Sequence, residues 1–132
     1  MFLLINLSEN NKIKLALFNE SIYYRKTYSG QNRDLLICID KFLKLKKLIL
    51  KKLRGLIVVV GYGGFTSTRL SVVVGNTLAY TLNIPIIATN NPELSKEDLL
   101  KLIPQIKKQP IGRLISATYS GEANIGKSKN NN

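Results

Sequence analysis

The sequence predicts one α/β domain whose elements follow the order βββαβαβα, with five strands in a mixed sheet. Three observations predict this class. Three short apolar segments separated by turns open the chain, a helical periodicity runs through residues 33–53, and the β-branched run 56–60 leads into a glycine-rich turn. With 132 residues, of which 45% are apolar, the chain can form one domain with a hydrophobic core and is too short for two ordinary ones.

The three segments that open the chain are strand candidates, and they comprise residues 2–7, 13–18 and 22–28. They are separated by the turn-rich residues 8–12 and by Asn19-Glu20. Such short connections favour an antiparallel meander. We therefore expect each strand to pair with the next one along the chain.

Residues 33–53 are predicted to form the first helix. Its apolar positions cover close to half of the circumference, more than the stripe of about 100° that one sheet face requires. The surplus predicts a second partner surface, and the alternative is ordinary burial against the sheet and a neighbouring helix. Lys46 falls inside the apolar arc, where its stem can pack while its ammonium reaches water or a carboxylate. The arc comprises Leu35, Ile39, Phe42, Ile49 and Leu53, with Leu36, Leu43 and Leu50 beside them, and the solvated face carries Lys41, Lys44, Lys51 and Lys52.

Two further strands and two further helices complete the domain. The uncharged run 56–60 is typical of a buried strand. After the glycine turn, a hydroxyl-rich start and the apolar spacing predict a helix to about Leu82, in which Gly75 is a close-packing position. A strand over residues 84–88 precedes a third helix, which begins after Ser95 and ends near Lys108, with a kink expected at Pro104. We expect residues 1–110 to form the domain and residues 111–132 to form an extended segment and a disordered basic tail.

The net charge of +12 is typical of proteins that bind nucleic acid or an acidic surface. Two features weaken that interpretation. Lysine greatly outnumbers arginine, whereas nucleic-acid sites favour the forked guanidinium group of arginine, and abundant asparagine indicates a general compositional bias. The charge alone therefore does not identify a partner.

The amino-acid types that the chain lacks or scarcely contains exclude several kinds of chemistry. The chain has no histidine and one cysteine, Cys38, which excludes zinc clusters of the usual ligands, Ser-His-Asp and Cys-His nucleophiles, and disulfide frameworks. Cys38 lies among leucine and isoleucine and is predicted to be an inert core thiol. No apolar run approaches the length of about 20 residues that spans a membrane, and residues 1–5 are too short for a signal peptide. We expect a cytoplasmic protein with no metal site.

The turn at residues 61–66 joins a strand to a helix start, which is the geometry of an anion site. Gly61, Gly63 and Gly64 relax its backbone, and Thr66, Ser67 and Thr68 offer hydroxyl groups for helix capping. The turn has no companion lysine or carboxylate for Mg²⁺, which favours a structural turn that shapes the helix entry over a phosphate site. Arg69 lies in the first helical turn, where the dipole disfavours a cation, and this indicates either a carboxylate partner or simple exposure. Residues 121–128 satisfy the P-loop pattern but lack the strand and long helix that it needs.

The element order is that of an RNase H-like half, as in ATPase domains of the actin, sugar-kinase and Hsp70 type (ASKHA). The stretch GYGGFTSTR at residues 61–69, with NIPIIAT at residues 83–89, resembles the bacterial TsaB (YeaZ) family, which usually has GPGSFTGLR and an IPVVGV-like strand. Gly61, Gly63, Phe65, Thr66 and Arg69 match that motif. The departures include Tyr62, Gly64 and Ser67 in the motif, and Asn6, which stands where the family usually has aspartate. The resemblance covers about residues 1–90, with weaker similarity at residues 119–122, and therefore implies the N-terminal half of the family fold.

The resemblance implies a role without catalysis or cofactor. TsaB proteins pair with TsaD, which transfers a threonylcarbamoyl group to adenosine 37 of tRNA, and TsaE is an associated ATPase. This chain would then contact a TsaD-like subunit, with a TsaE-like ATPase as a further partner, meet tRNA only through the complex, and form a homodimer when alone. The alternatives are a nucleotide-binding ATPase-like fragment that uses the 61–66 turn, and a basic RNA-binding module. The predicted pairing face comprises Leu35, Ile39, Phe42, Leu43 and Ile49 of the first helix with Val73 and Thr77 of the second.

Overall fold

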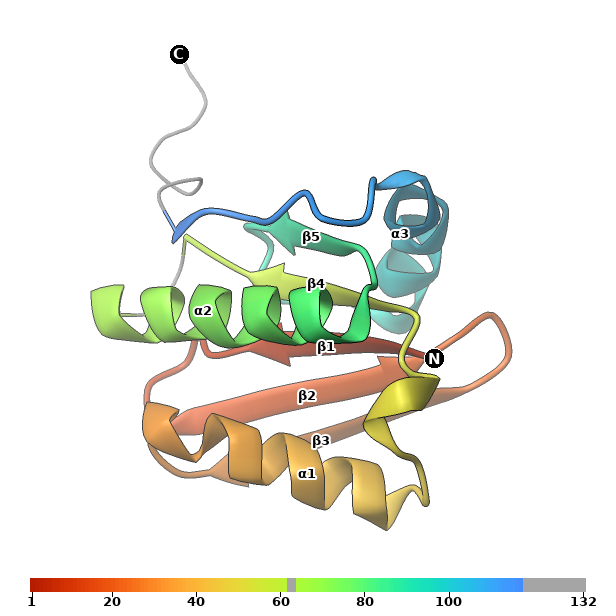
Figure 1. The fold of residues 1–132 in the computed structure, drawn as a ribbon. Helices are drawn as coiled ribbons and strands as arrows, with labels where there is room; N and C mark the ends of the chain where they lie inside the picture. The colour runs from red at the N-terminus through yellow and green to blue at the C-terminus, as the bar shows by residue number, and fades with distance from the viewer. Residues whose placement is uncertain (62–63, 118–132) are drawn as a thin grey trace.

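The computed structural model describes residues 1–61 and 64–117, and the side chain of Phe65 is not among the parts described. These residues form a five-stranded mixed sheet with helices on both faces (Figure 1). The strand order is β3-β2-β1-β4-β5, in which β1 pairs antiparallel with β2 and parallel with β4. The strands are β1 (Phe2–Asn6), β2 (Lys12–Phe18), β3 (Tyr23–Ser29), β4 (Gly55–Val59) and β5 (Ile86–Thr89). The helices are α1 (Leu35–Leu45), α2 (Phe65–Leu82) and α3 (Lys96–Lys108), with the short 3₁₀ helices η1 (Asn32–Asp34) and η2 (Leu50–Lys52).

The predicted fold class and element order are confirmed. The strands β1, β2 and β3 form the expected antiparallel meander, in which Leu4 lies opposite Ala16 and Ala16 opposite Arg25. Most strand boundaries differ from the prediction by one residue. The last strand begins at Ile86 rather than residue 84, and the Pro85 carbonyl accepts a hydrogen bond from the Leu56 N–H at 3.0 Å. Proline has no N–H to donate, so regular pairing starts after it.

The single helix predicted over residues 33–53 is wrong. The stretch forms η1, α1, a connection and η2, because the chain leaves the helix after Leu45 and Lys47 adopts a left-handed backbone with φ 58°. The Leu48 N–H closes this end by donating to the Leu43 carbonyl at 2.8 Å. The apolar arc therefore does not continue to Ile49 and Leu53 on one helix. The predicted apolar arc was too wide because it combined residues of two segments whose backbones point in different directions.

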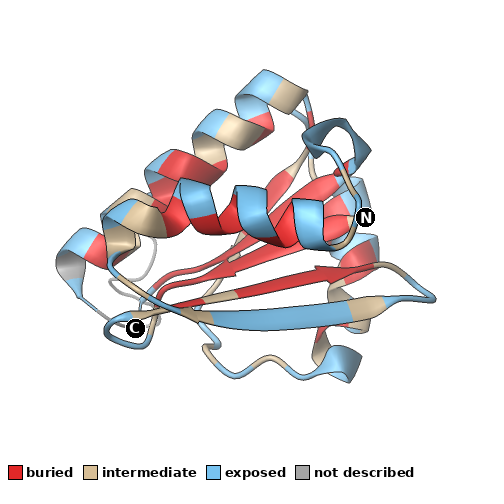
Figure 2. Ribbon diagram, turned by 90° about the horizontal axis from the view of Figure 1, so that it is seen from below, coloured by how far each residue is buried: buried red, intermediate tan, exposed pale blue. Residues whose placement is uncertain are grey.

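Two apolar clusters hold the layers together. One lies between the sheet and the α1–α2 layer, and the other lies between the opposite face of the sheet and α3. Figure 2 shows buried residues concentrated in the central strands and on the helix sides that face them. Gly75 is a close-packing position as predicted, since a Cβ there would lie 2.7 Å from Cγ2 of Val58. The helices α1 and α2 thus belong to one layer, each with an outer side directed away from the sheet.

The helix α3 begins and ends as predicted. Ser95 is its N-cap, and its hydroxyl accepts a hydrogen bond from the Asp98 N–H at 3.1 Å while the Asp98 carboxylate accepts one from the Ser95 N–H at 3.0 Å. The bond from the Ser95 backbone lowers the pKa of Asp98. Pro104 lies within the helix, which is continuous from Lys96 to Lys108. The reciprocal cap fixes the direction in which the chain enters α3.

Residues 111–117 follow α3 and contact α2. The Asn76 side chain donates to the Ile115 carbonyl at 2.8 Å and accepts from the Ile115 N–H at 3.0 Å, so it pairs with that backbone as a strand would. Ile115 and Ala117 pack against the α1–α2 cluster. Part of the segment predicted as extended is therefore attached to the domain. The predicted tail and the P-loop pattern at residues 121–128 lie outside the described residues.

Candidate functional site

The glycine turn connects β4 to α2, as the sequence predicts. Gly61 has φ 88°, a value that glycine adopts without strain, and Gly64 is the N-cap of α2 in an extended conformation. Gly63 lies outside the described residues. The N-cap position is Gly64, which has no side chain to cap the helix, so none of the expected hydroxyl residues occupies that position. Ser67 instead donates to the Asn32 side chain at 2.9 Å, and Thr66 and Arg69 are exposed at the start of α2.

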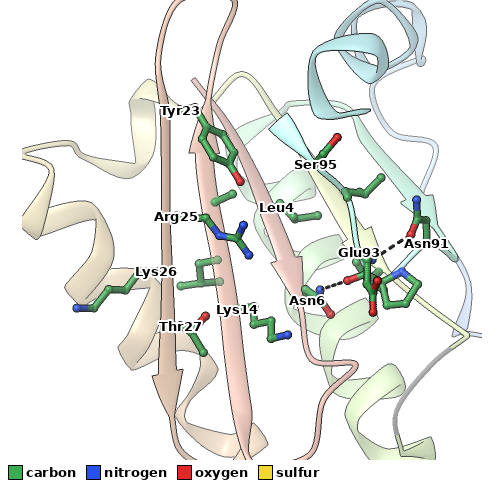
Figure 3. Close-up of a pocket in the computed structure, with 15 residues that line it drawn as sticks. Leu4, Asn6, Lys14, Tyr23, Arg25, Lys26, Thr27, Asn91, Glu93 and Ser95 are labelled. Carbon is green, nitrogen blue, oxygen red and sulfur yellow. Dashed lines mark hydrogen bonds between the residues drawn. The ribbon is translucent and has the colours of Figure 1, made fainter. Parts of the chain in front are cut away.

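Asn6 is the last residue of β1 and one of the few buried polar residues in the described ranges. Its side chain is 4% exposed, and both ends of the amide are occupied. The nitrogen donates to the Pro92 carbonyl at 2.9 Å (Figure 3). The oxygen accepts from the Ser8 N–H at 2.9 Å. The amide therefore joins the end of β1 to the segment that follows β5. A carboxylate could make the second bond but could not donate the first.

Asn6→Asp is expected to lower the free energy of unfolding by about 2 kcal/mol at neutral pH, because two buried acceptors would then face each other. Urea denaturation measures the change. The loss should shrink as pH falls through the raised pKa of the introduced carboxyl, since its protonated form can donate to Pro92. Asn91→Asp is the matched control, because only the Asn91 side-chain oxygen is bonded, to the Glu93 N–H. Equal stability of the Asn6 and Asn91 variants at neutral pH would show that the donor is unimportant.

A cavity of about 310 Å³ lies beside Asn6, on the side of the sheet that carries α3. Leu4 and Ala16 line it from the sheet, and residues 91–95 line it from the segment that precedes α3 (Figure 3). Lys14 and Arg25 bring cations to the cavity and Glu93 brings a carboxylate, whereas the side chain of Lys26 points away from it. Lys14 is held by Glu9 at 2.7 Å, and this hydrogen bond lowers the pKa of Glu9. Sequence reasoning missed the cavity, because register and the crossing segment 91–95 bring its residues together.

The described residues contain no cluster of three or more His, Cys, Asp or Glu side chains that could hold a metal ion. Cys38 is a free, buried cysteine, as predicted. Burial raises the pKa of its thiol, with a smaller contribution from Asp34, so the thiol form predominates at neutral pH. No helix in the described ranges is both long enough and apolar enough to cross a bilayer.

The structure divides the predicted pairing residues into two groups. Leu35, Ile39, Phe42 and Leu43 are buried against the sheet and form part of the core. Their burial corrects the expectation that the wide arc of the first helix is an outer surface. Ile49 is 59% exposed but lies in the connection after α1 rather than on the helix.

Val73 and Thr77 lie on the outer side of α2, as predicted, and Val73 is 60% exposed. Tyr80, which is 78% exposed, follows them at the next helical position on the same side. Leu36 and Ile37 are the exposed apolar residues at the start of α1. Sequence reasoning did not single out Tyr80, although its spacing of seven residues from Val73 was a usable signal.

The comparisons with known proteins identify a shared fold. No protein-family model and no curated protein sequence matches the chain. Among solved structures, YeaZ from Pseudomonas aeruginosa matches with a TM-score of 0.60 and 22% identity. A structure described as an uncharacterized protein with similarity to peptidase YeaZ from Pseudomonas aeruginosa matches with a TM-score of 0.61 and 22% identity.

Each match covers 67% of this chain and 42% of the solved chain, so the protein spans less than half the length of these neighbours. At this identity the agreement concerns the fold. The mixed sheet and the order of its strands and helices are those expected from the resemblance to TsaB (YeaZ). Over two thirds of its length, this chain therefore has the fold of the YeaZ structures.

Proposed function

We propose that this protein is a non-catalytic subunit for the formation of threonylcarbamoyladenosine in tRNA, and that it pairs with a TsaD-like transferase through the outer side of α2. The observation that carries the proposal is the YeaZ fold combined with an exposed apolar stripe on that helix. The stripe, called the α2 stripe below, comprises Val73, Thr77 and Tyr80.

The α2 stripe has the features of a contact surface. Val73, Thr77 and Tyr80 are four and three residues apart, so they project from one side of the helix. An exposed tyrosine is a residue type that often dominates binding energy, because it offers a large rigid surface and one polar group. Leu36 and Ile37 are further exposed apolar residues, and they lie on α1 in the same layer.

The side chains that are present support the proposal of a role without catalysis. Asn6 replaces the first-strand carboxylate, and both ends of its amide are bonded within the domain. The chain has no histidine to act as a base, and its cysteine is buried with a raised pKa. A peptidase activity, as the description of one structural neighbour suggests for YeaZ, needs an accessible nucleophile beside a base. The features found here favour a binding role.

Val73→Asp tests the proposal. It is expected to weaken the complex with a TsaD-like transferase at least tenfold, because association would bury an unpaired charge (roughly 2 kcal/mol or more). Size-exclusion chromatography and calorimetry with the two purified proteins measure the loss. Ile111→Asp is the matched control, since Ile111 is 55% exposed and lies outside the helix layer. Phe42 cannot serve as an interface probe because it is fully buried.

The stability of each variant is measured alongside its binding to the transferase. Urea denaturation should show that Val73→Asp and Ile111→Asp unfold at similar concentrations, because both side chains are exposed. If both variants bind the transferase as tightly as the unmodified chain, the α2 stripe is not the interface. If the unmodified chain does not bind at all, the proposed partner is wrong.

A further inference from the structure

The stretch from Lys41 to Arg54 contains the densest charge in the protein. It holds seven cations and no carboxylate, and these are Lys41, Lys44, Lys46, Lys47, Lys51, Lys52 and Arg54. The adjacent Asp40 is bonded to Lys44 at 3.0 Å, and the ammonium of Lys46 lies 4.4 Å from the ring centre of Tyr24. The other five cations of the stretch have no salt-bridge partner within the described residues. This surface therefore keeps a strong positive charge.

Apolar side chains protrude from the middle of this charge. Leu48 and Leu53 anchor the connection by packing on the α1–α2 cluster. Between the anchors, Ile49 is 59% exposed and Leu50 is 39% exposed, and Leu45 is 56% exposed at the end of α1. We call residues 44–52, with these three apolar side chains and their lysines, the basic tip.

The fold gives no reason for apolar residues at the outer positions of the basic tip. The left-handed turn at Lys47 directs the chain out of α1, and η2 returns it to β4. The contacts that this excursion makes with the core come from Leu48 and Leu53. Polar side chains at residues 49 and 50 would satisfy the same backbone path. Exposed apolar side chains that are grouped together are typical of a surface that another phase or molecule covers.

We propose that the basic tip binds an anionic phospholipid surface, with Ile49 and Leu50 entering the boundary between headgroups and acyl chains. Lysines around an apolar tip match such a surface in both respects, since the ammonium groups attract lipid phosphates and the apolar side chains leave water. Nucleic acid would use the lysines but not isoleucine and leucine. Six of the seven cations are lysine. Lysine is a point charge suited to general attraction of phosphates, whereas arginine is suited to bidentate binding of one phosphate.

The proposed membrane contact is independent of the proposed pairing with a transferase. The basic tip lies between α1 and β4, whereas the α2 stripe is on another helix. The tip also adjoins the start of the chain, where the Met1 ammonium donates to the Lys52 carbonyl at 3.3 Å and the Arg54 N–H donates to the Met1 carbonyl at 2.7 Å. These bonds hold the returning segment in place, so the apolar tip is presented by a defined backbone.

Co-sedimentation with vesicles tests the proposal on the full chain. Binding is expected to vesicles of phosphatidylcholine mixed with phosphatidylglycerol at about 0.1 M salt and not to phosphatidylcholine alone. Ile49→Ser with Leu50→Ser should lower the partition coefficient about tenfold without changing the charge. Lys51→Gln with Lys52→Gln should lower it by a similar factor.

Matched controls come from other surfaces of the protein. Ile111→Ser with Leu114→Ser removes two exposed apolar side chains elsewhere, and Lys101→Gln with Lys108→Gln removes two exposed lysines of α3. Both controls should bind vesicles within about twofold of the unmodified chain. Since the chain has no tryptophan, Ile49→Trp provides a single fluorophore. Its emission should shift to shorter wavelength with the mixed vesicles, and that of Val73→Trp should not.

Three results would overturn the membrane contact. The first is equal binding to the two vesicle types, or no binding to either of them. The second is unchanged binding after Ile49→Ser with Leu50→Ser, which would reduce the tip to a diffuse basic surface. The third is a requirement for the same two lysines in binding a single-stranded RNA, without any vesicle binding, which would assign the charge to nucleic acid.

Discussion

Phe42→Ala is expected to destabilise the protein by about 3–5 kcal/mol, the largest effect that we predict for a single substitution. Phe42 is fully buried in the cluster between the sheet and the α1–α2 layer. Truncation to alanine removes most of its apolar surface and leaves a cavity that neighbouring side chains of fixed strands cannot fill. Such a loss is a large fraction of the about 5–15 kcal/mol by which typical domains are stable, so the urea midpoint should fall steeply.

Urea denaturation followed by far-ultraviolet circular dichroism measures this loss. Leu36→Ala on the same helix is the control, because Leu36 is 56% exposed and its truncation should cost less than about 1 kcal/mol. Similar midpoints for the two variants would contradict the placement of Phe42 in the core. The comparison also distinguishes the buried side of α1 from its exposed side. The helical pattern of the sequence had placed both sides in one apolar arc.

Gly55→Ala is expected to destabilise the protein by about 1–3 kcal/mol through overpacking. A Cβ at Gly55 would lie 2.4 Å from Cγ2 of Ile106 and 3.0 Å from Cδ1 of Phe2. Ile106 is fully buried, and its Cγ2 is attached directly to Cβ, so it cannot move aside as the end of a flexible chain could. The added methyl group should therefore push α3 away from β4.

A double-mutant cycle tests the direct contact between these two residues. Ile106→Ala alone should cost about 2–5 kcal/mol, because it leaves a cavity under α3. In the Gly55→Ala background the same change should cost less, since the new methyl group occupies part of that space. Urea denaturation of the four proteins gives the coupling energy. Strictly additive losses would show that Gly55 and Ile106 do not contact each other.

Much of the fold could be predicted because its signals are local. Alternating and continuous apolar runs indicated all five strands, and Ser95 with Asp98 indicated the start of α3, because a cap depends on residues three positions apart. The first helix was predicted too long because the periodicity continued through Ile49 and Leu53. Periodicity cannot register a backbone reversal, and Lys47 makes that reversal in a left-handed conformation that lysine does not favour.

The candidate surfaces were predicted in part. Val73 and Thr77 were assigned to the pairing face on the outer side of α2, and both are exposed there. Leu35, Ile39, Phe42 and Leu43 were assigned to the same surface, although the sheet covers them. An apolar position that faces the core and one that faces a partner have the same residue types. Only the layer beside them distinguishes the two.

The sequence by itself determined the class of fold, the order of the elements and the absence of histidine chemistry, because these depend on composition and on neighbours a few residues apart. The tertiary structure decided which features are functional candidates. It placed the Asn6 amide against Pro92, 86 residues away, and Asn76 against Ile115, 39 residues away. It also left Ile49 and Leu50 outside the core while their neighbours Leu48 and Leu53 contact it. The physical reason is that burial and hydrogen bonding join residues distant in sequence, and local patterns carry no record of which ones meet.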